Sequence, residues 1–247
     1  MRLKDKVVVI TGGARGIGRA AAECCAADGA AVVIGDLLAE QGEATAAAIA
    51  AAGGRVRFVP TDVTSEAECR RLITTAVETF GRLDVLITCA GILRGDWVPV
   101  EELDDAVFSS VLDVNVRGTF LCVKYAVPHL PKPGGVVICL ASGAGVRGGS
   151  SSMAYGASKG GVHGLTLALE PHLAERGIRV HDVCPGGIAT DMKLNNIGNL
   201  AERKGESRQA AMEAARATLG DPIGVGRVLA FLASDDADYV RGSIHTR

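Results

Sequence analysis

The chain has 247 residues, 48% of them hydrophobic and 22% charged, which is enough for one large domain with a substantial buried core. Its formal net charge of −2 gives no broad attraction for nucleic acid or for an anionic membrane. No stretch approaches the ~20 apolar residues needed to span a bilayer. The first residues, Met1–Asp5, lead directly into a strand pattern and lack the apolar region and cleavage site of a signal peptide, so we expect a cytoplasmic protein.

Short β-branched runs alternate with helical patterns along most of the chain. The runs are apolar nearly throughout, which is typical of parallel strands covered on both faces. This alternation predicts an α/β protein, with residues 1–247 forming a single-domain, doubly wound Rossmann fold that has a mainly parallel sheet and helices on both faces. The predicted strands are Val7–Thr11, Ala31–Gly35, Val56–Pro60, Asp84–Cys89, Val136–Leu140 and Ile178–Cys184.

Helical patterns fill the intervals. One follows Ser65-Glu66-Ala67-Glu68, the pattern of a capping box. Two longer segments, about Leu103–Val127 and Ser152–Arg176, are apolar on more than one face. Residues 193–222 break the strand–helix rhythm, and two interpretations are open for them: a helical lid over a pocket, or a solvated surface excursion.

The first predicted strand ends in a glycine-rich turn that leads into a helix. Glycines at positions 12, 16 and 18 permit a tight turn and let backbone amides approach a pyrophosphate, which the helix N-terminus also attracts. The turn reads Thr11-Gly12-Gly13-Ala14-Arg15-Gly16-Ile17-Gly18. Because a strand precedes it and a helix follows, the pattern favours a dinucleotide-binding site.

The choice between NAD and NADP depends on two charged residues. Asp36 ends the second strand, where a carboxylate can accept hydrogen bonds from the adenosine ribose and repel the 2′-phosphate of NADP. Arg15 argues mildly the other way if it lies near that phosphate, although it is equally a solvated loop residue. The pattern favours NAD, with NADP as the weaker alternative.

A second group of residues indicates proton-transfer chemistry. Tyr155 and Lys159 are four residues apart in a predicted helix, which puts the phenol and the ammonium on one face. An adjacent ammonium lowers a tyrosine pKa from its ordinary value of ~10 toward the range of a useful base. Ser142 follows another strand and is placed to hydrogen-bond a substrate oxygen.

In this combination and order the sequence resembles the short-chain dehydrogenase/reductase family over nearly its whole length. The glycine turn matches the family's cofactor loop. By resemblance, Asp62 and Val63 contact the adenine, and Ala90 and Gly91 lie along the cofactor. The other matches are Asn115, Ser142, Tyr155 and Lys159 for the catalytic tetrad, and Pro185, Gly186, Ile188 and Thr190 for the segment that closes on the nicotinamide.

The resemblance implies a role for each tetrad member. Tyr155 would donate and accept the proton, while Lys159 would lower its pKa and hold the nicotinamide ribose. Ser142 would orient the substrate oxygen, and Asn115 would support a water-linked proton relay. The purely structural alternatives are that Asn115 kinks or caps a helix, that Ser142 ends a strand and that Thr190 caps the next helix.

The chain departs from the family pattern at two places. Cys89 stands where relatives carry an asparagine that helps to tie the central sheet, and we interpret it as structural rather than nucleophilic. The C-terminal residues, Tyr239–Arg247, lack the usual Asp-Gly-Gly, which predicts a short or altered final strand and puts tetramer assembly in doubt.

No metal site is expected. The 7 cysteines include no C-x-x-C pair, and none of the 5 histidines begins an H-E-x-x-H pattern. By resemblance, the two long helical segments form a dimer interface, so a homodimer or homotetramer is expected. The partners are then a small-molecule substrate and other copies of the chain, with no nucleic acid and no membrane.

Three functions remain under consideration. The first is an NAD-dependent oxidoreductase that interconverts a secondary alcohol and a ketone by hydride transfer. The second, an NADP-linked 3-oxoacyl thioester reductase, is disfavoured by Asp36 and would need a basic docking patch for an acidic carrier protein. Candidates for that patch are Arg94, Arg117, Arg147 and Lys193. The third, a non-catalytic dinucleotide-binding sensor, is opposed by the intact tetrad.

The substrate pocket is expected from four segments: Leu93–Trp97, Ser142–Val146, Gly186–Gly187 and residues 193–215. Its apolar members favour a moderately hydrophobic substrate, since pockets in general are mostly apolar. These members are Leu93, Trp97, Val146, Met192 and Leu194.

Overall fold

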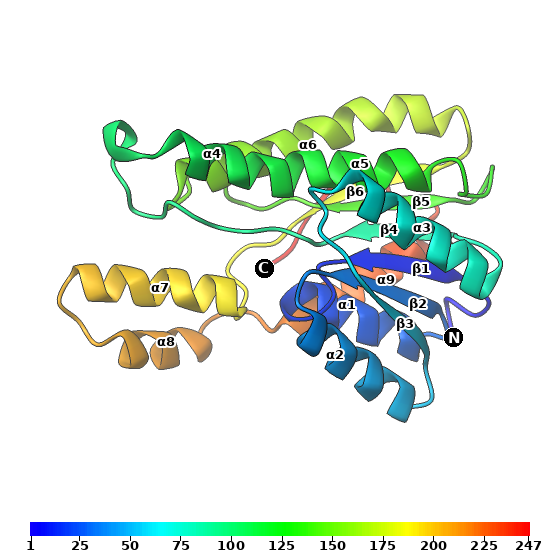
Figure 1. Cartoon of the computed structure of the whole chain (residues 1–247), viewed down its shortest axis with the longest axis horizontal. Coiled ribbons are helices and arrows are strands. Elements are labelled where there is room, and N and C mark those ends of the chain that lie inside the picture. The colour runs from blue at the N-terminus through cyan, green and yellow to red at the C-terminus, as the bar shows by residue number, and fades with distance from the viewer.

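The computed structural model describes all residues from Met1 to Arg247 and is built around one seven-stranded sheet (Figure 1). All neighbouring strands are parallel, in the order β3-β2-β1-β4-β5-β6-β7. The predicted doubly wound Rossmann fold is therefore confirmed, and the six predicted strands agree to within one residue at each end. The strands are β1 Val7–Thr11, β2 Ala31–Asp36, β3 Arg55–Pro60, β4 Val85–Thr88, β5 Val136–Leu140, β6 Arg179–Cys184 and β7 Gly242–His245.

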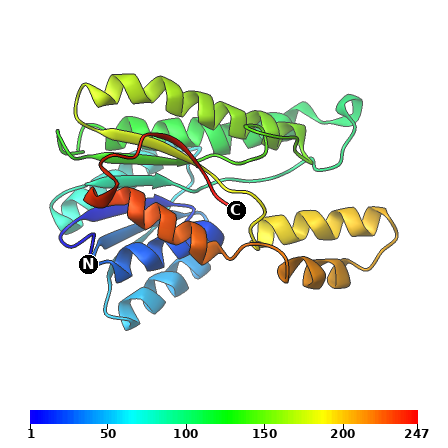
Figure 2. The ribbon, with the colours of Figure 1, turned by 180° about the vertical axis from the view of Figure 1, so that it is seen from behind.

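Helices cover both faces of this sheet (Figures 1 and 2). The first face carries α1 Gly16–Ala27, α2 Ala39–Ala51 and α9 Pro222–Ala233. The second carries α3 Glu66–Phe80, α4 Asp105–Leu112, α5 Gly118–Ala126 and α6 Met153–Ala174. Two further helices, α7 Asp191–Arg203 and α8 Arg208–Arg216, pack on each other and project beyond the end of the sheet.

The central strands are apolar throughout because their successive residues enter two different hydrophobic cores. In β1, Val8 and Ile10 pack with α1 and α9, whereas Val7 and Val9 pack with α3, α5 and α6. Each fully buried aliphatic side chain stabilises the fold by roughly 1.5–3 kcal/mol. Burial on both faces is the physical reason why these strands lack polar alternation.

The predicted helix at 103–127 is interrupted. It forms as α4 and α5 joined by one π-helical turn, Asp113–Arg117, which contains the buried Asn115. The combined run Asp105–Ala126 is 22 residues long and apolar enough, by length and composition alone, to cross a bilayer. The prediction that no stretch approaches this length is therefore wrong. Counting uninterrupted apolar residues missed a helix whose few charged residues are widely spaced.

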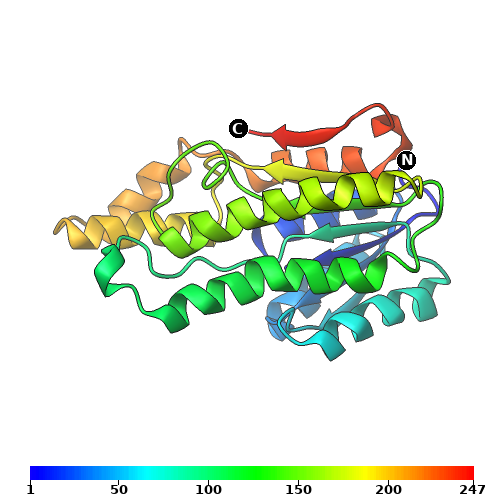
Figure 3. The same ribbon diagram turned by 90° about the horizontal axis from the view of Figure 1, so that it is seen from above.

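The final strand is short, as predicted, but it completes the sheet. β7 pairs in parallel with β6 at the sheet edge (Figure 3). A buried polar group also links the two strands: Ser243 Oγ donates to Asp182 Oδ1 at 2.5 Å, and His163 Nδ1 on α6 lies 2.9 Å from Asp182 Oδ2. The edge strand β7 is thus held by side-chain hydrogen bonds as well as by its backbone hydrogen bonds to β6.

His181, which precedes Asp182 on β6, is expected to make the stability of the fold sensitive to acid. It is fully buried, and burial lowers its pKa to about 4, with Arg179 adding to the effect. The unfolded chain therefore takes up a proton as the pH falls below about 6.5, while the folded chain does not until about pH 4. The stability that neutral His181 contributes should be fully present above pH 6.5 and should be lost as the pH falls from 6.5 to about 4.

We predict that the free energy of unfolding falls by on the order of 3 kcal/mol from this group between pH 7 and pH 4. Denaturant titrations at several pH values would measure it. His181→Leu should flatten the dependence, whereas the exposed control His129→Gln should keep it. Equal losses in the wild type and in His181→Leu would show that His181 is not the responsible group.

Candidate active site

The carboxyl ends of the parallel strands open into one large cavity of ≈ 1130 Å³. Every residue predicted to bind the cofactor lines it, from Gly12 on the glycine turn to Thr190 before α7, and Ser142 lines it as well. Such a crevice, outside the carboxyl edge of an open sheet, is where ligands bind in doubly wound folds. Asn115 is the one predicted site residue that does not line the cavity.

The glycine turn fits closely against its surroundings. A Cβ on Gly18 would lie 2.1 Å from the Gly12 carbonyl oxygen, and one on Gly12 would lie 2.5 Å from the Ala90 nitrogen. Gly12 and Gly16 also adopt positive φ values of 68° and 58°, which side chains disfavour. Glycine at these positions lets α1 begin directly against the turn.

The N-terminus of α1 has no side-chain cap. Its N-cap residue, Arg15, makes no capping hydrogen bond, whereas side chains cap α3, α4, α6, α7, α8 and α9. The first amides of α1 are thus left without a side-chain acceptor beside the cavity. Uncapped amides and the positive end of the helix dipole suit a diphosphate.

Asp36 ends β2 at the rim of the cavity. Its Oδ2 accepts from the Ala14 amide at 2.9 Å, and its Oδ1 accepts from the Leu38 amide at 3.0 Å. A carboxylate has about four acceptor positions, so each oxygen retains room for a ligand hydroxyl. Arg15 turns toward the start of α7, with its Nη1 3.7 Å from Asp191 Oδ2.

Asp62 is held by residues of the following turn. Its Oδ1 accepts from the amide and the hydroxyl of Thr64 at 2.9 and 2.8 Å. The predicted capping box is only half formed: Ser65 Oγ accepts from the Glu68 amide, but the Glu68 carboxylate accepts from the Asp62 amide at 2.8 Å. The Ser65 amide is already bonded to the Asp62 carbonyl, which leaves Glu68 free to fix Asp62.

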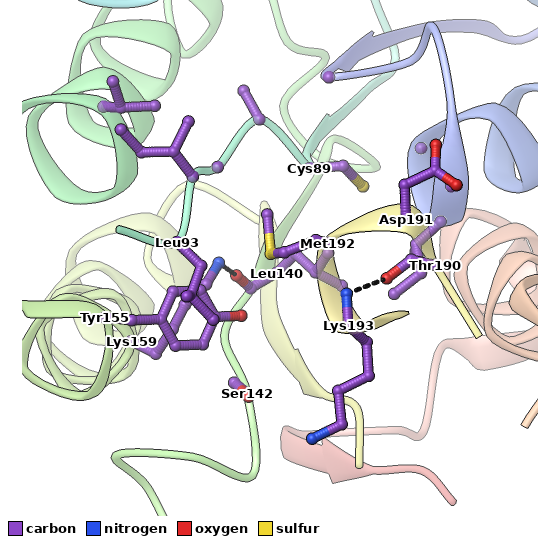
Figure 4. Close-up of a pocket in the computed structure, with 18 of the residues that line it drawn as sticks. Cys89, Leu93, Leu140, Ser142, Tyr155, Lys159, Thr190, Asp191, Met192 and Lys193 are labelled. Atoms are coloured by element: carbon purple, nitrogen blue, oxygen red, sulfur yellow. Dashed lines mark hydrogen bonds between the residues drawn. The ribbon is translucent and has the colours of Figure 1, made fainter. Parts of the chain in front are cut away.

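Tyr155 and Lys159 lie on the first turns of α6, facing the end of β5 (Figure 4). Lys159 Nζ donates to the Leu140 carbonyl at 2.6 Å and lies 5.7 Å from the centre of the Tyr155 ring. Burial lowers the pKa of Lys159 to about 8, so the ammonium is still largely protonated at neutral pH. Burial raises the pKa of Tyr155, which the nearby Ser142 hydroxyl offsets in part. In the free protein Tyr155 is therefore a neutral phenol.

Asn115 lies behind the cavity and is fully buried. Its Nδ2 donates to the Ile92 carbonyl at 3.0 Å and to Ser158 Oγ at 2.9 Å, and its Oδ1 accepts from the Ile92 amide at 2.8 Å. It thus fastens the segment after β4 to α6. A Cβ on Gly91 would lie 3.3 Å from Asn115 Oδ1 and 3.6 Å from Lys159 Nζ, so glycine leaves these groups close to the cavity wall.

Cys89 lines the cavity at the end of β4. Burial raises the pKa of its thiol to about 12, which keeps it protonated and poorly nucleophilic at neutral pH.

The substrate end of the cavity differs from the prediction in several residues. Leu93, Trp97 and Met192 line it, but Val146 and Leu194 do not, because Val146 packs on the hydrophobic core and Leu194 is buried. Of residues 193–215 only Lys193 and Asn196 reach it. The turn before α6, Gly149–Ser151, lines the cavity and was missed by the prediction, although a loop at the carboxyl edge of a strand is where lining residues are expected.

An uncapped glycine turn, an acidic residue ending β2 and a tyrosine–lysine pair at one sheet edge define the class of nicotinamide-dinucleotide oxidoreductases. Comparison with known proteins agrees: the family model for short chain dehydrogenases matches residues 6–199. The chain is 39% identical over 244 residues to cis-4-hydroxycyclohexanecarboxylate dehydrogenase of Sinomonas cyclohexanicum, covering 97% of this chain and 94% of that one. It is 36% identical over 242 residues to 2,5-dichloro-2,5-cyclohexadiene-1,4-diol dehydrogenase of Sphingobium indicum, covering 98% and 94%.

Among solved structures, levodione reductase matches with a TM-score of 0.91 at 34% identity, covering 99% of this chain and 96% of that one. The chain belongs to the short-chain dehydrogenase/reductase family. It is an oxidoreductase that acts on CH–OH or C=O groups, and its family uses NAD(H) or NADP(H).

The close packing of the glycine turn gives a testable consequence. We predict that Gly18→Ala weakens the binding of NADH and NADPH by on the order of tenfold or more, because the added methyl group forces α1 away from the turn. Fluorescence titration measures this directly. The matched control is Gly224→Ala on an exposed part of α9, where a Cβ meets nothing within 4 Å.

That control should bind dinucleotide normally and gain about 0.5–1 kcal/mol of stability, since alanine favours the helix. Unchanged nucleotide affinity in a folded Gly18→Ala protein would contradict the assigned role of the turn.

Proposed function

We propose that this enzyme is an NAD-dependent dehydrogenase or reductase that interconverts a secondary alcohol and a ketone. The observation that carries the proposal is the arrangement along one cavity: Tyr155, Lys159 and Ser142 line one part and Asp36 lines another. The first group suits proton transfer to and from a substrate oxygen, and the second suits an unphosphorylated adenosine ribose.

Tyr155 is proposed as the proton acceptor in alcohol oxidation and the proton donor in ketone reduction. Its side chain is half-buried in the cavity wall, where a nearby positive charge acts on the phenol more strongly than in bulk water. Lys159, fixed by the Leu140 carbonyl, contributes that charge, and Ser142 orients the substrate oxygen. Bound nicotinamide supplies the hydride acceptor and a further positive charge. Asn115 does not line the cavity, but we propose that it still supports the proton relay, because its hydrogen bonds hold the Ile92 backbone and the Ser158 hydroxyl in place.

NAD is favoured over NADP by two contacts. Asp36 brings a carboxylate to the rim of the cavity, where a 2′-phosphate would meet like charge. Arg15, the residue that could neutralise such a phosphate, pairs instead with Asp191. The pairing is exposed and weak, so the argument rests mainly on Asp36.

For the substrate, we propose a secondary alcohol or ketone on a six-membered carbon ring. Leu93, Trp97 and Met192 give the substrate end apolar surface. Two relatives carry a cyclohexane or cyclohexadiene alcohol in their names, which supports this class. The carrier-linked thioester alternative is weakened because Arg117 donates to the Thr64 carbonyl at 2.7 Å and does not join Arg94 and Lys193 at the cavity.

The proposed enzyme is a cytoplasmic homodimer or homotetramer. All 7 cysteines are free thiols, as is usual in a reducing compartment. α4 and α5 follow one another end to end, and α6 runs alongside them (Figure 3). Exposed Phe120 and Leu167 give α5 and α6 apolar surface that a second copy would cover. Light scattering tests this assembly, and a monomer at micromolar concentration would overturn it.

The mechanism predicts that Tyr155→Phe lowers turnover by roughly 10²–10⁴-fold, because no other group can exchange the proton. Steady-state assays with cis-4-hydroxycyclohexanecarboxylate and related cyclic alcohols would measure it. The same variant should bind NADH normally. Near-normal turnover would refute the role of Tyr155.

The cofactor assignment predicts tighter binding of NADH than of NADPH by about tenfold or more. Arg15→Ala serves as the control and should leave the NADH dissociation constant nearly unchanged. A preference for NADPH that disappears in Arg15→Ala would identify Arg15 as a phosphate contact and put the thioester reductase first.

A further inference from the structure

A network of side-chain hydrogen bonds joins three separate chain segments at the substrate end of the cavity. Asn196 on α7 donates from Nδ2 to Asp96 Oδ2 at 3.1 Å and to Ser151 Oγ at 2.9 Å. Asn199 donates from Nδ2 to the same oxygen of Asp96 at 3.1 Å. These bonds connect residues that are 45 to 103 positions apart in the sequence. They bridge the loop after β4, the turn before α6 and helix α7.

The orientation of the Asn199 amide is fixed from the opposite side. Arg208 on α8 donates to Asn199 Oδ1 at 2.7 Å and to Asn195 Oδ1 at 2.8 Å. With its oxygen held by a cation, Asn199 can present only its donors to Asp96. No lysine or arginine pairs with Asp96, so the two amides are its side-chain partners. Hydrogen bonds to a charged acceptor are stronger than those between neutral groups.

The loop that carries Asp96 is strained at the next residue. Trp97 has a φ of 62°, in the left-handed region that side chains disfavour, and its amide donates to the Ser151 carbonyl at 2.7 Å. Such a conformation persists only where its surroundings hold it. Trp97 lines the cavity, and the contacts of Asp96 and Ser151 hold the backbone that carries its indole ring.

The same loop also contacts the helix that carries Tyr155. Ser152 caps α6 by accepting from the Tyr155 amide at 3.1 Å, and its hydroxyl donates to the Arg94 carbonyl at 2.6 Å. A continuous set of hydrogen bonds and adjoining residues therefore runs from α7 through Asp96 and the loop to the N-terminus of α6.

We propose that Asp96 is a positioning residue for substrate, which clasps α7 against the Trp97 loop and thereby shapes the substrate end of the cavity. The proposal rests on the proposed function and adds a residue that touches neither the dinucleotide end of the cavity nor the reacting atoms. α7 packs chiefly against α8 rather than against the sheet, so the Asp96 contacts are its main polar tie across the cavity. No hydrogen bond of this network reaches Asp36 or the glycine turn, whose link to α7 is the exposed Arg15–Asp191 pair at the start of the helix. Loss of Asp96 thus impairs substrate binding and leaves dinucleotide binding intact.

Asp96→Ala is the direct test, with Glu213→Ala as the matched control. Glu213 is an exposed carboxylate on α8 that accepts from Gln209 Nε2 of the same helix at 2.9 Å, so it takes no part in the Asp96 contacts. In Asp96→Ala we expect the KM for the alcohol to rise by about tenfold, a larger change than in kcat, because a loosened wall no longer orients the substrate. The dissociation constant for NADH should stay within about twofold. Asp96→Asn retains an oxygen acceptor and should restore part of the loss.

Trp97 is the only tryptophan of the chain, so intrinsic fluorescence reports this loop without any substrate. With NAD bound, Asp96→Ala should shift the emission of Trp97 to longer wavelength and speed hydrogen exchange of the amides of 191–203, whereas Glu213→Ala should do neither. If Asp96→Ala fails to fold, Asn199→Ala, which removes one of the two donors, should show the same changes to a smaller extent.

Unchanged emission, exchange and KM in Asp96→Ala would overturn the proposal, as would equal changes in Glu213→Ala. The two claims can be separated. A wild type that is inactive on every cyclic alcohol, with the exchange pattern as expected, would refute the proposed function but support the contact of Asp96 with α7. An active enzyme in which Asp96→Ala leaves the exchange of α7 unchanged would support the proposed function and refute the role of Asp96.

Discussion

The proposed chemistry of this enzyme depends on an ammonium group held inside the protein. Lys159 is almost completely buried, and its Nζ is fixed by the carbonyl at the end of β5. Removing a charge from water costs several kcal/mol, and the lowered pKa of Lys159 is a direct expression of that cost. This cost is partly offset because the end of β5, α6 and the contacts of Asn115 are all arranged around the ammonium group. A tyrosine one helical turn away is then subject to a field that water would screen.

The two ends of the cavity are built by different means. The dinucleotide end consists largely of backbone: a glycine turn, the open amides of α1 and strand ends whose positions the sheet determines. The substrate end consists of side chains from loops and from α7, joined by hydrogen bonds such as those of Asp96. A dinucleotide end built from backbone, combined with a substrate end built from loop side chains, explains how one fold serves many substrates. It also explains why the cofactor class can be argued from motifs while the substrate has to be argued from contacts.

The parts of the structure that could be predicted are those in which local pattern determines position. The strands followed from apolar runs, and Gly12, Gly18 and Asp36 followed from spacing relative to those strands. The sequence offered a kink at Asn115 only as an alternative, because the bonds of Asn115 to Ile92 and Ser158 within the π-helical turn join segments that are distant in the sequence. Glu68 bonds to Asp62 rather than to Ser65 because a backbone contact had already used the expected donor. The contact between Asp96 and Asn196 joins residues 100 positions apart, and no local pattern encodes it.

The measurement that tests the central claim most directly is the pH dependence of kcat/KM for alcohol oxidation, in the wild type and in Lys159→Met. If the buried ammonium lowers the pKa of Tyr155 in the complex, the wild-type rate rises with pH through an inflection below the ordinary tyrosine value of about 10. In Lys159→Met that inflection should move upward by about one pH unit or more, with a lower rate at neutral pH. The same inflection in both proteins would contradict the account, because the proton acceptor would then be insensitive to the charge on which the site depends.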